Sequence, residues 1–173
     1  MRFTPDAVWN VVVLGFVVTA AITDVGWRKI PRALTLVALG GGLVFHWATG
    51  NALSAATAAF VGFGIGLTLF RLGAIGGGDV KLITAMGALL GLGRWVVAME
   101  VAVIVAGVIA FIQVCRRGMV RQTFHNMGLL VRGVWTRGLV EHPVVNLRNP
   151  SLVRMPFGLA AALGTLAALV MNT

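Results

Sequence analysis

Apolar residues gather in six runs along the chain, and short polar connections separate them. The runs span about residues 7–23, 33–49, 52–72, 80–93, 95–115 and 155–172. A helix needs about 20 apolar residues to cross the hydrocarbon core of a bilayer. The pattern therefore predicts an all-α integral membrane protein with about six transmembrane helices. Several runs are short for a full span, so we expect those helices to stand nearly upright or to thin the bilayer locally.

The composition agrees with a membrane protein. Hydrophobic residues make up 58% of the 173 residues and charged residues 11%, and the mean hydropathy is +0.94. Six spans and their connections occupy the whole chain, so we predict a single membrane-embedded domain over residues 1–173. The spacing Gly62-x-x-x-Gly66 and Gly87-x-x-x-Gly91 predicts faces on which helix backbones approach closely.

The positive charge is concentrated in three connections. The net charge of +9 would suggest nucleic acid as the partner of a soluble protein. Here, however, the cations lie within 28–32, 71–81 and 116–154, while the connections near 50–51 and 93–94 carry almost none. Basic loops stay in the cytoplasm, so we predict both termini outside and contact with anionic lipid headgroups. We predict no nucleic-acid partner.

The connection 116–154 is the one long polar stretch. Its apolar residues recur at helical spacing, with arginines among the other positions: Val120, Phe124, Met127, Val131, Val134 and Trp135. This pattern predicts a cytoplasmic amphipathic segment between the fifth and sixth helices, lying in the headgroup layer. A structural anchor and a lid or docking surface for substrate are both compatible with it.

Two aspartates are the main candidates for chemistry. Asp24 and Asp79 each fall where an apolar run meets a basic connection, and therefore at a similar membrane depth. Acids at such a boundary are candidates for function by default. Two adjacent carboxylates share a proton, so the ionised one can activate water while the other polarises a carbonyl. Peptide hydrolysis is one interpretation of the pair, and structural salt bridges are the other.

Other reactive side chains offer less. Cys115 is the only cysteine, which excludes an intrachain disulfide and a thiolate-rich zinc site. His46, His125 and His142 lack metal-ligand spacing. We therefore predict neither a metal nor a cofactor. Glu100 lies within the fifth apolar run, where we expect a helix-packing or hydrated residue.

Three glycines precede the second aspartate. Gly76, Gly77 and Gly78 lack side chains, which allows unusual dihedral angles and the close approach of another backbone. We predict that they bind an extended substrate, together with Lys81. An ordinary turn explains the glycines equally well, and a positive-inside anchor explains Lys81. The spacing differs from that of a phosphate-binding P-loop.

The sequence from Gly76 to Lys81, Gly-Gly-Gly-Asp-Val-Lys, resembles the GxGD signature of type IV prepilin peptidases. Asp24, followed by basic residues and Ile30-Pro31, is similar to the first catalytic aspartate of that family and its downstream Ile-Pro-Asn. Met155-Pro156-Phe157-Gly158 resembles the Pro-Tyr/Phe-Gly that opens the last helix of the family. The resemblance implies that Asp24 and Asp79 are the catalytic pair.

The resemblance implies an aspartyl endopeptidase that removes the leader of prepilins or pseudopilins at the cytoplasmic membrane face, just after a glycine. Arg32 stands where the family usually has Asn. Larger members carry paired CxxC motifs and an N-methyltransferase activity, whereas this chain, without such motifs, resembles the short members of Flp/Tad pilus systems. We therefore expect cleavage without methylation. A small transporter or channel and a catalytically silent pilus-assembly protein are the alternatives.

Overall fold

The computed structural model describes residues 5–27, 31–121, 123, 125, 128, 129 and 157–171. Its elements are all helices: α1 (Pro5–Trp27), α2 (Arg32–Ala48), α3 (Ala52–Arg71), α4 (Gly77–Arg116) and α6 (Phe157–Met171). The predicted all-α class is therefore confirmed for this part of the chain. The amphipathic segment predicted within 116–154 lies mostly outside the described residues.

The helices present an apolar surface. By length and composition, α1, α3 and α4 are able to cross a bilayer, and α2 and α6 are shorter apolar helices. Large apolar side chains are exposed on each of these helices, for example Val11, Val37, Phe60, Ile104 and Val170. A soluble monomer rarely exposes so much contiguous apolar surface. The structure is therefore consistent with hydrocarbon as the surrounding solvent.

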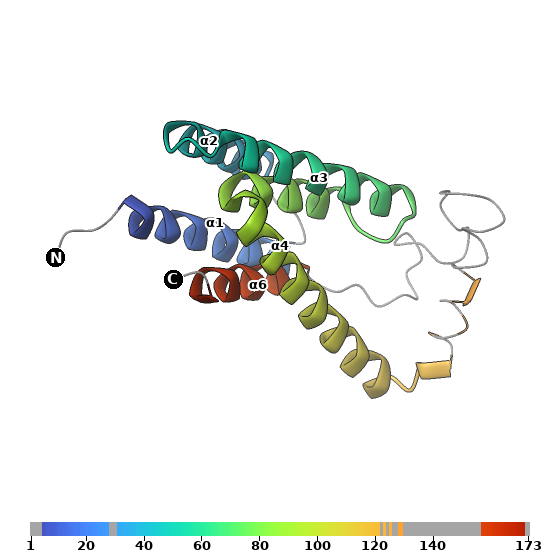
Figure 1. Cartoon of the computed structure of the whole chain (residues 1–173). Coiled ribbons are helices and arrows are strands. Elements are labelled where there is room, and N and C mark those ends of the chain that lie inside the picture. The colour runs from blue at the N-terminus through green and yellow to red at the C-terminus, as the bar shows by residue number, and fades with distance from the viewer. Residues whose placement is uncertain are drawn as a thin grey trace.

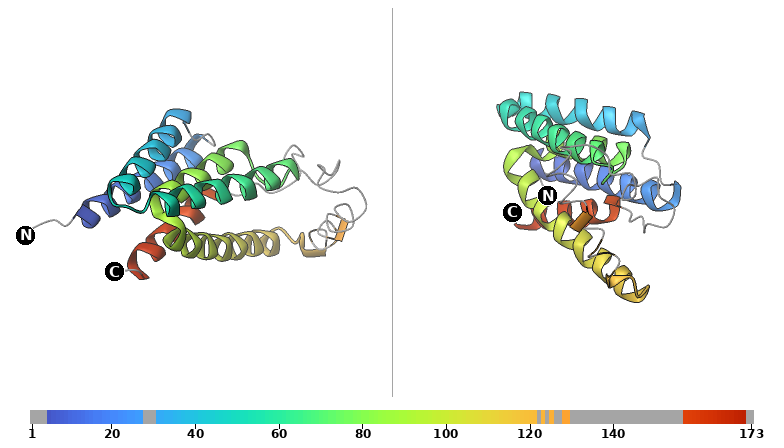
Figure 2. Two further views of the ribbon diagram at one scale, coloured as in Figure 1. Left: turned by 45° about the horizontal axis from the view of Figure 1, so that its top comes forward. Right: turned by 90° about the vertical axis from the view of Figure 1, so that its right-hand side faces the viewer.

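Successive helices alternate in direction, so the bundle has two distinct ends (Figures 1 and 2). Helix α1 begins and helix α6 finishes at one of them, which we call the terminal end. At the opposite end α1 finishes, α2 begins, α3 finishes and α4 begins. We call this the basic end, because it carries Arg32, Arg71 and Lys81. The basic residues that the sequence assigned to one membrane side are thus together in space where they are described.

Helix α4 folds back on itself at Gly91. A straight helix of its 40 residues would be about 60 Å long, twice the thickness of the hydrocarbon core. Gly91 has non-helical dihedrals of φ 69° and ψ 169°. Trp95 Nε1 donates to Ile83 O at 3.2 Å, whereas the 12 residues between them would span about 18 Å of straight helix. The chain therefore turns within α4, between a first part (77–90) and a second part (92–116).

This turn divides α4 into two helices. The sequence predicts separate helices over 80–93 and 95–115, and the structure has helices over 77–90 and 92–116 that meet at Gly91 without an intervening loop. The five labelled elements of the described residues thus include one, α4, that consists of two helices. The chain reverses at a single glycine whose conformation other residues avoid.

Side chains from three other helices satisfy the backbone groups that the turn releases. Leu89 O accepts hydrogen bonds from Trp9 Nε1 at 3.0 Å and His46 Nε2 at 3.2 Å. Leu92 N donates to Ser54 Oγ at 2.9 Å. Buried backbone groups without partners are costly, so these contacts stabilise the turn. Helices α1, α2 and α3 thus hold α4 at the terminal end.

Glycines allow α3 and α4 to pack closely. A Cβ atom added at Gly87 would lie 2.6 Å from the carbonyl carbon of Ala58, and one added at Gly66 would lie 3.2 Å from Val80 Cα. The first distance is too short for any side chain. The close approach predicted from glycine spacing is confirmed at these positions, whereas Gly91 is the turn residue itself.

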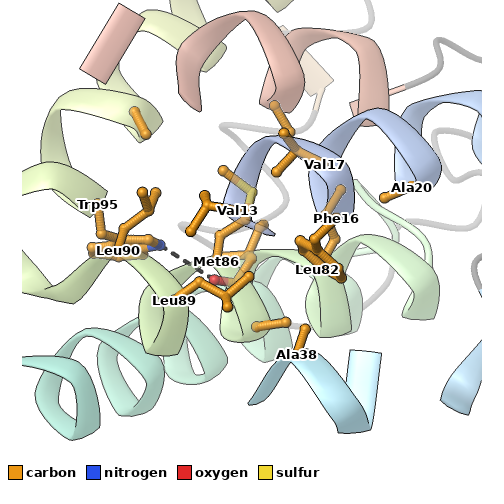
Figure 3. Packing of buried hydrophobic residues seen from close by; sticks show 14 of the residues in the cluster. Val13, Phe16, Val17, Ala20, Ala38, Leu82, Met86, Leu89, Leu90 and Trp95 are labelled. Carbon is orange, nitrogen blue, oxygen red and sulfur yellow. Dashed lines mark hydrogen bonds between the residues drawn. The ribbon is translucent and has the colours of Figure 1, made fainter. Parts of the chain in front are cut away.

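The core lies where α1 meets the first part of α4 beneath α6 (Figure 3). The largest side chains with less than 2% exposure are Val13 and Val17 of α1, Leu82 and Met86 of α4, and Thr165 of α6. Val17 precedes Asp24 by about two turns of α1, and Leu82 follows Asp79 by about one turn of α4. The core therefore fixes the two helix ends that carry the aspartates.

Candidate active site

Asp24 lies in the last turn of α1, where a second helix binds it. Its Oδ2 atom accepts a hydrogen bond from Gly158 N at 2.8 Å. Helix α6 begins at Phe157, so the amide of Gly158 is among the first-turn N–H groups that have no acceptor within their own helix. Asp24 supplies that acceptor from α1. The bond fixes the carboxylate while leaving it half-buried.

The absence of a side chain at Gly158 makes this contact possible. An added Cβ atom would lie 2.9 Å from Asp24 Oδ2, 3.0 Å from Asp24 Cβ and 3.2 Å from Ala21 Cα. Real Cβ atoms keep larger distances from such neighbours. The α1–α6 contact at the basic end therefore requires glycine at this position.

Asp79 is the third residue of α4 and caps the start of its own helix. Its Oδ2 atom accepts a hydrogen bond from Gly76 N at 2.9 Å, and Asp79 N donates to Gly76 O at 3.1 Å. A carboxylate three residues after the N-cap that binds back to it is a recognised helix-start motif. Like Asp24, Asp79 is half-buried and held by a backbone N–H.

Both aspartates lie at the basic end of the bundle, Asp24 in the last turn of α1 and Asp79 in the first turn of α4. The negative charge of Asp24 is near enough to act on Asp79. Of the four acidic residues in the described part of the chain, these two are half-buried, whereas Asp6 and Glu100 are exposed.

The glycine triplet differs from the predicted loop. Gly77 and Gly78 form the first turn of α4, and Gly76 is its N-cap in an extended conformation with φ −82° and ψ 158°. None of these angles requires glycine, so the expectation of unusual dihedrals here is wrong. The cap made by Asp79 explains why the helix begins at this point. The predicted contact with substrate therefore depends on the absence of Cβ atoms in the three glycines, which leaves the backbone accessible beside Asp79.

Lys81 lies on another side of α4. Residues two apart on a helix do not share a face, so Lys81 is turned away from Asp79. It lines a groove next to α2, together with Arg32. A role of Lys81 in binding substrate remains a prediction.

The side chains that the structure brings together at this end are two carboxylates. Among the described residues, no group of three or more His, Cys, Asp or Glu side chains is placed to hold a metal ion. Cys115 is exposed in the last turn of α4, and His142 lies outside the described residues.

The sequence pattern does not predict a role for Gly158. The signal that points to it is the motif Met155-Pro156-Phe157-Gly158, which resembles the start of the last helix of the family. The structure pairs Gly158 with Asp24 across 134 residues of sequence. Such a contact depends on how α1 and α6 pack, which the motif itself does not reveal.

Comparison with protein-family models matches residues 11–111 to the type IV leader peptidase family. The match runs from α1 into the second part of α4 and includes Asp24 and Asp79. Comparisons with curated proteins and with solved structures gave no match. The matched segment is more than half of the chain and agrees with the resemblance seen in the sequence, so the chain belongs to the type IV leader peptidase family.

Proposed function

We propose that this protein is an intramembrane aspartyl endopeptidase that removes the short basic leader from prepilins or pseudopilins. The observation that carries the proposal is the placement of Asp24 and Asp79, from two different helices, at the same end of an apolar bundle and within electrostatic range of one another. Membership of the leader peptidase family supports the reaction class. We assign the catalytic role to these two aspartates.

The chemistry requires one proton between two carboxylates. The ionised aspartate takes a proton from a water molecule, whose oxygen attacks the scissile carbonyl carbon. The protonated aspartate donates its proton to the carbonyl oxygen, and the tetrahedral intermediate collapses when the amide nitrogen receives a proton and leaves. The hydrogen bonds from Gly158 N and Gly76 N hold the carboxylates in place beforehand, which reduces the reorganisation needed during reaction.

The position of the pair suits a prepilin-type substrate. Such a substrate has a basic leader in the cytoplasm and an apolar helix in the bilayer, so its cleavage site lies near the inner boundary. Arg32, Arg71 and Lys81 mark the basic end of this protein, which we assign to the cytoplasmic face of the inner membrane, with both termini outside. A glycine before the scissile bond disfavours helix and helps to present an extended peptide. The backbone of Gly76, Gly77 and Gly78 is the surface we propose for that peptide.

Cleavage in cells tests the assignment. The chain is co-expressed with a Flp-type prepilin, and leader removal is followed by gel shift while membrane abundance is followed by immunoblot. We expect Asp24→Asn and Asp79→Asn each to lower cleavage by at least about 10²-fold, the usual contribution of an acid–base group. Asp6→Asn is the matched control, since Asp6 is exposed in the first turn of α1.

Three outcomes contradict the proposal. If the unaltered chain does not cleave the prepilin, an assembly protein without activity becomes the better description. If either Asn variant cleaves normally at normal abundance, the aspartate pair is not the catalytic group. If Asp6→Asn is as damaging as the other two, the loss reflects folding or insertion in place of catalysis.

A further inference from the structure

A groove of about 470 Å³ lies between α2, α3 and the first part of α4. Its wall is mostly apolar, and it is lined by Arg32, Thr35, Leu36, Leu39, Phe63, Val80, Lys81, Thr84 and Ala85. The two hydroxyl groups in the wall donate to their own helices, Thr35 to Arg32 O and Thr84 to Val80 O. The body of the groove therefore offers apolar contact and little hydrogen bonding.

The groove is separate from the aspartate pair. Successive residues on a helix are rotated by about 100°, which places Lys81 about 200° around α4 from Asp79. Asp79 is on the side near Asp24 and α6, whereas Lys81 is on the side next to α2. A ligand in the groove would thus leave the catalytic side of α4 free.

Two cations mark the basic end of the groove. Arg32 is the first residue of α2 and Lys81 the fifth of α4, and both side chains are exposed. Neither forms an ion pair with another residue in the part of the chain that the structure describes. Unpaired cations above an apolar groove at the boundary of a bilayer complement a ligand with one negative group and one apolar chain.

The rim of the groove faces hydrocarbon. Leu36 and Phe63 line it with exposed fractions of 65% and 46%. The groove is therefore open on the side from which a lipid chain would enter.

We propose that the groove binds one anionic phospholipid, with an acyl chain in its apolar body and the phosphate between Arg32 and Lys81. The charge of the two side chains selects the headgroup, and the apolar wall selects the chain. This proposal assigns Lys81 to the lipid in place of the substrate, and its test does not require catalytic activity.

Native mass spectrometry of the purified full chain measures the selection. The protein is released from detergent after incubation with phosphatidylglycerol or with phosphatidylcholine of the same acyl chains. We expect one phosphatidylglycerol to remain bound with a preference of about 30-fold, the effect of two interfacial cations. The double variant Arg32→Gln/Lys81→Gln should lose this preference. Arg71→Gln is the matched control, because Arg71 is exposed at the same end and does not line the groove.

A second variant tests the apolar body. Leu36→Trp places a ring over the rim without changing charge, and it should reduce retention of the lipid while the thermal unfolding midpoint in detergent stays unchanged. The proposal is overturned if the double variant retains the preference, or if Arg71→Gln loses it equally. It is also overturned if glycerol phosphate competes as well as the intact lipid, or if Leu36→Trp retains the lipid fully. Displacement of the lipid by a prepilin leader peptide would assign the groove to the substrate and likewise overturn it.

Discussion

Replacing Gly158 by alanine is the sharpest perturbation of the aspartate pair, because the added atom would meet the carboxylate directly. The new Cβ atom would lie 2.9 Å from Asp24 Oδ2 and 3.2 Å from Ala21 Cα. Atoms in favourable contact are about 3.5–4.0 Å apart, so Asp24 or α6 must move by about 0.5–1 Å. Rotation of the Asp24 side chain would break its hydrogen bond to Gly158 N, which is 2.8 Å long.

The expected loss has two parts. Overpacking of a tight contact costs about 1–3 kcal/mol, and loss of a hydrogen bond to a charged group costs about 1.5–3 kcal/mol. Both costs lower the free energy of unfolding. They do not add fully, because the movement that relieves the overpacking is the same movement that breaks the hydrogen bond. Catalysis is more sensitive, because a displacement of about 1 Å at reacting groups lowers rates by about 10²-fold. We therefore expect Gly158→Ala to lose more activity than stability.

Prepilin cleavage per folded molecule is the assay, with the folded fraction measured by thermal unfolding of the purified chain. Gly107→Ala is the neutral control, since no heavy atom lies within 4 Å of its added Cβ atom. Gly87→Ala is the packing control, because its Cβ atom would lie 2.6 Å from the carbonyl carbon of Ala58, away from the aspartates. Gly87→Ala should lower stability and abundance while the remaining folded molecules cleave normally.

The reasoning is refuted if Gly158→Ala cleaves like the unaltered chain at equal folded abundance. It is also refuted if Gly87→Ala and Gly158→Ala show the same ratio of activity loss to stability loss. A double-mutant cycle supplies a readout that does not depend on cleavage. Asp24→Ala removes the carboxylate that the new methyl group meets, so Gly158→Ala should destabilise the Asp24→Ala background less than the unaltered protein.

Two further substitutions test other glycines. Gly91→Ala should lower the free energy of unfolding by about 2–4 kcal/mol, because a backbone with φ 69° strains residues other than glycine and the new Cβ atom would lie 3.1 Å from Ser54 Oγ. Thermal unfolding in detergent measures this loss, and an unchanged midpoint would contradict the turn. Gly77→Ala should leave stability unchanged or slightly raised, since its Cβ atom has ordinary contact with Phe70 at 3.8 Å, but should lower prepilin cleavage about tenfold or more by obstructing the peptide. Normal cleavage by Gly77→Ala would reject the proposed substrate contact.

The bounds of the helices could be predicted from the sequence where turn-forming residues separate the apolar runs. The apolar runs 33–49 and 52–72 nearly coincide with α2 (Arg32–Ala48) and α3 (Ala52–Arg71). Pro31 precedes the first of these helices, and Gly50 with Asn51 separates the two. Gly50 has a positive φ of 76°, which suits the residue that ends a helix. These signals act through the local backbone, so they are readable without tertiary structure.

The turn in α4 and the partner of Asp24 could not be predicted in the same way. The sequence predicts a connection near 93–94, between the apolar runs 80–93 and 95–115, whereas the chain turns at Gly91. The turn depends on donors from α1 and α2 that meet Leu89 O, and these donors are far away in sequence. The hydrogen bond between Gly158 and Asp24 likewise joins residues that are far apart in sequence. That both aspartates lie at one end of the bundle was predictable, because it depends on the order and lengths of the apolar runs.

The position of one aspartate relative to the other depends on the turn at the opposite end of the bundle. Asp79 belongs to the first part of α4, whereas α6 packs on the second part, where Gly164 contacts the backbone of Ala98 and Ala102. Helix α1 packs more extensively on α6 than on α4, and α6 holds Asp24 through Gly158. The angle between the two parts of α4 is set at Gly91, so a change in that angle moves α6 and Asp24 relative to Asp79. The apolar bundle thus links a structural turn at the terminal end to the geometry on which the proposed chemistry at the basic end depends.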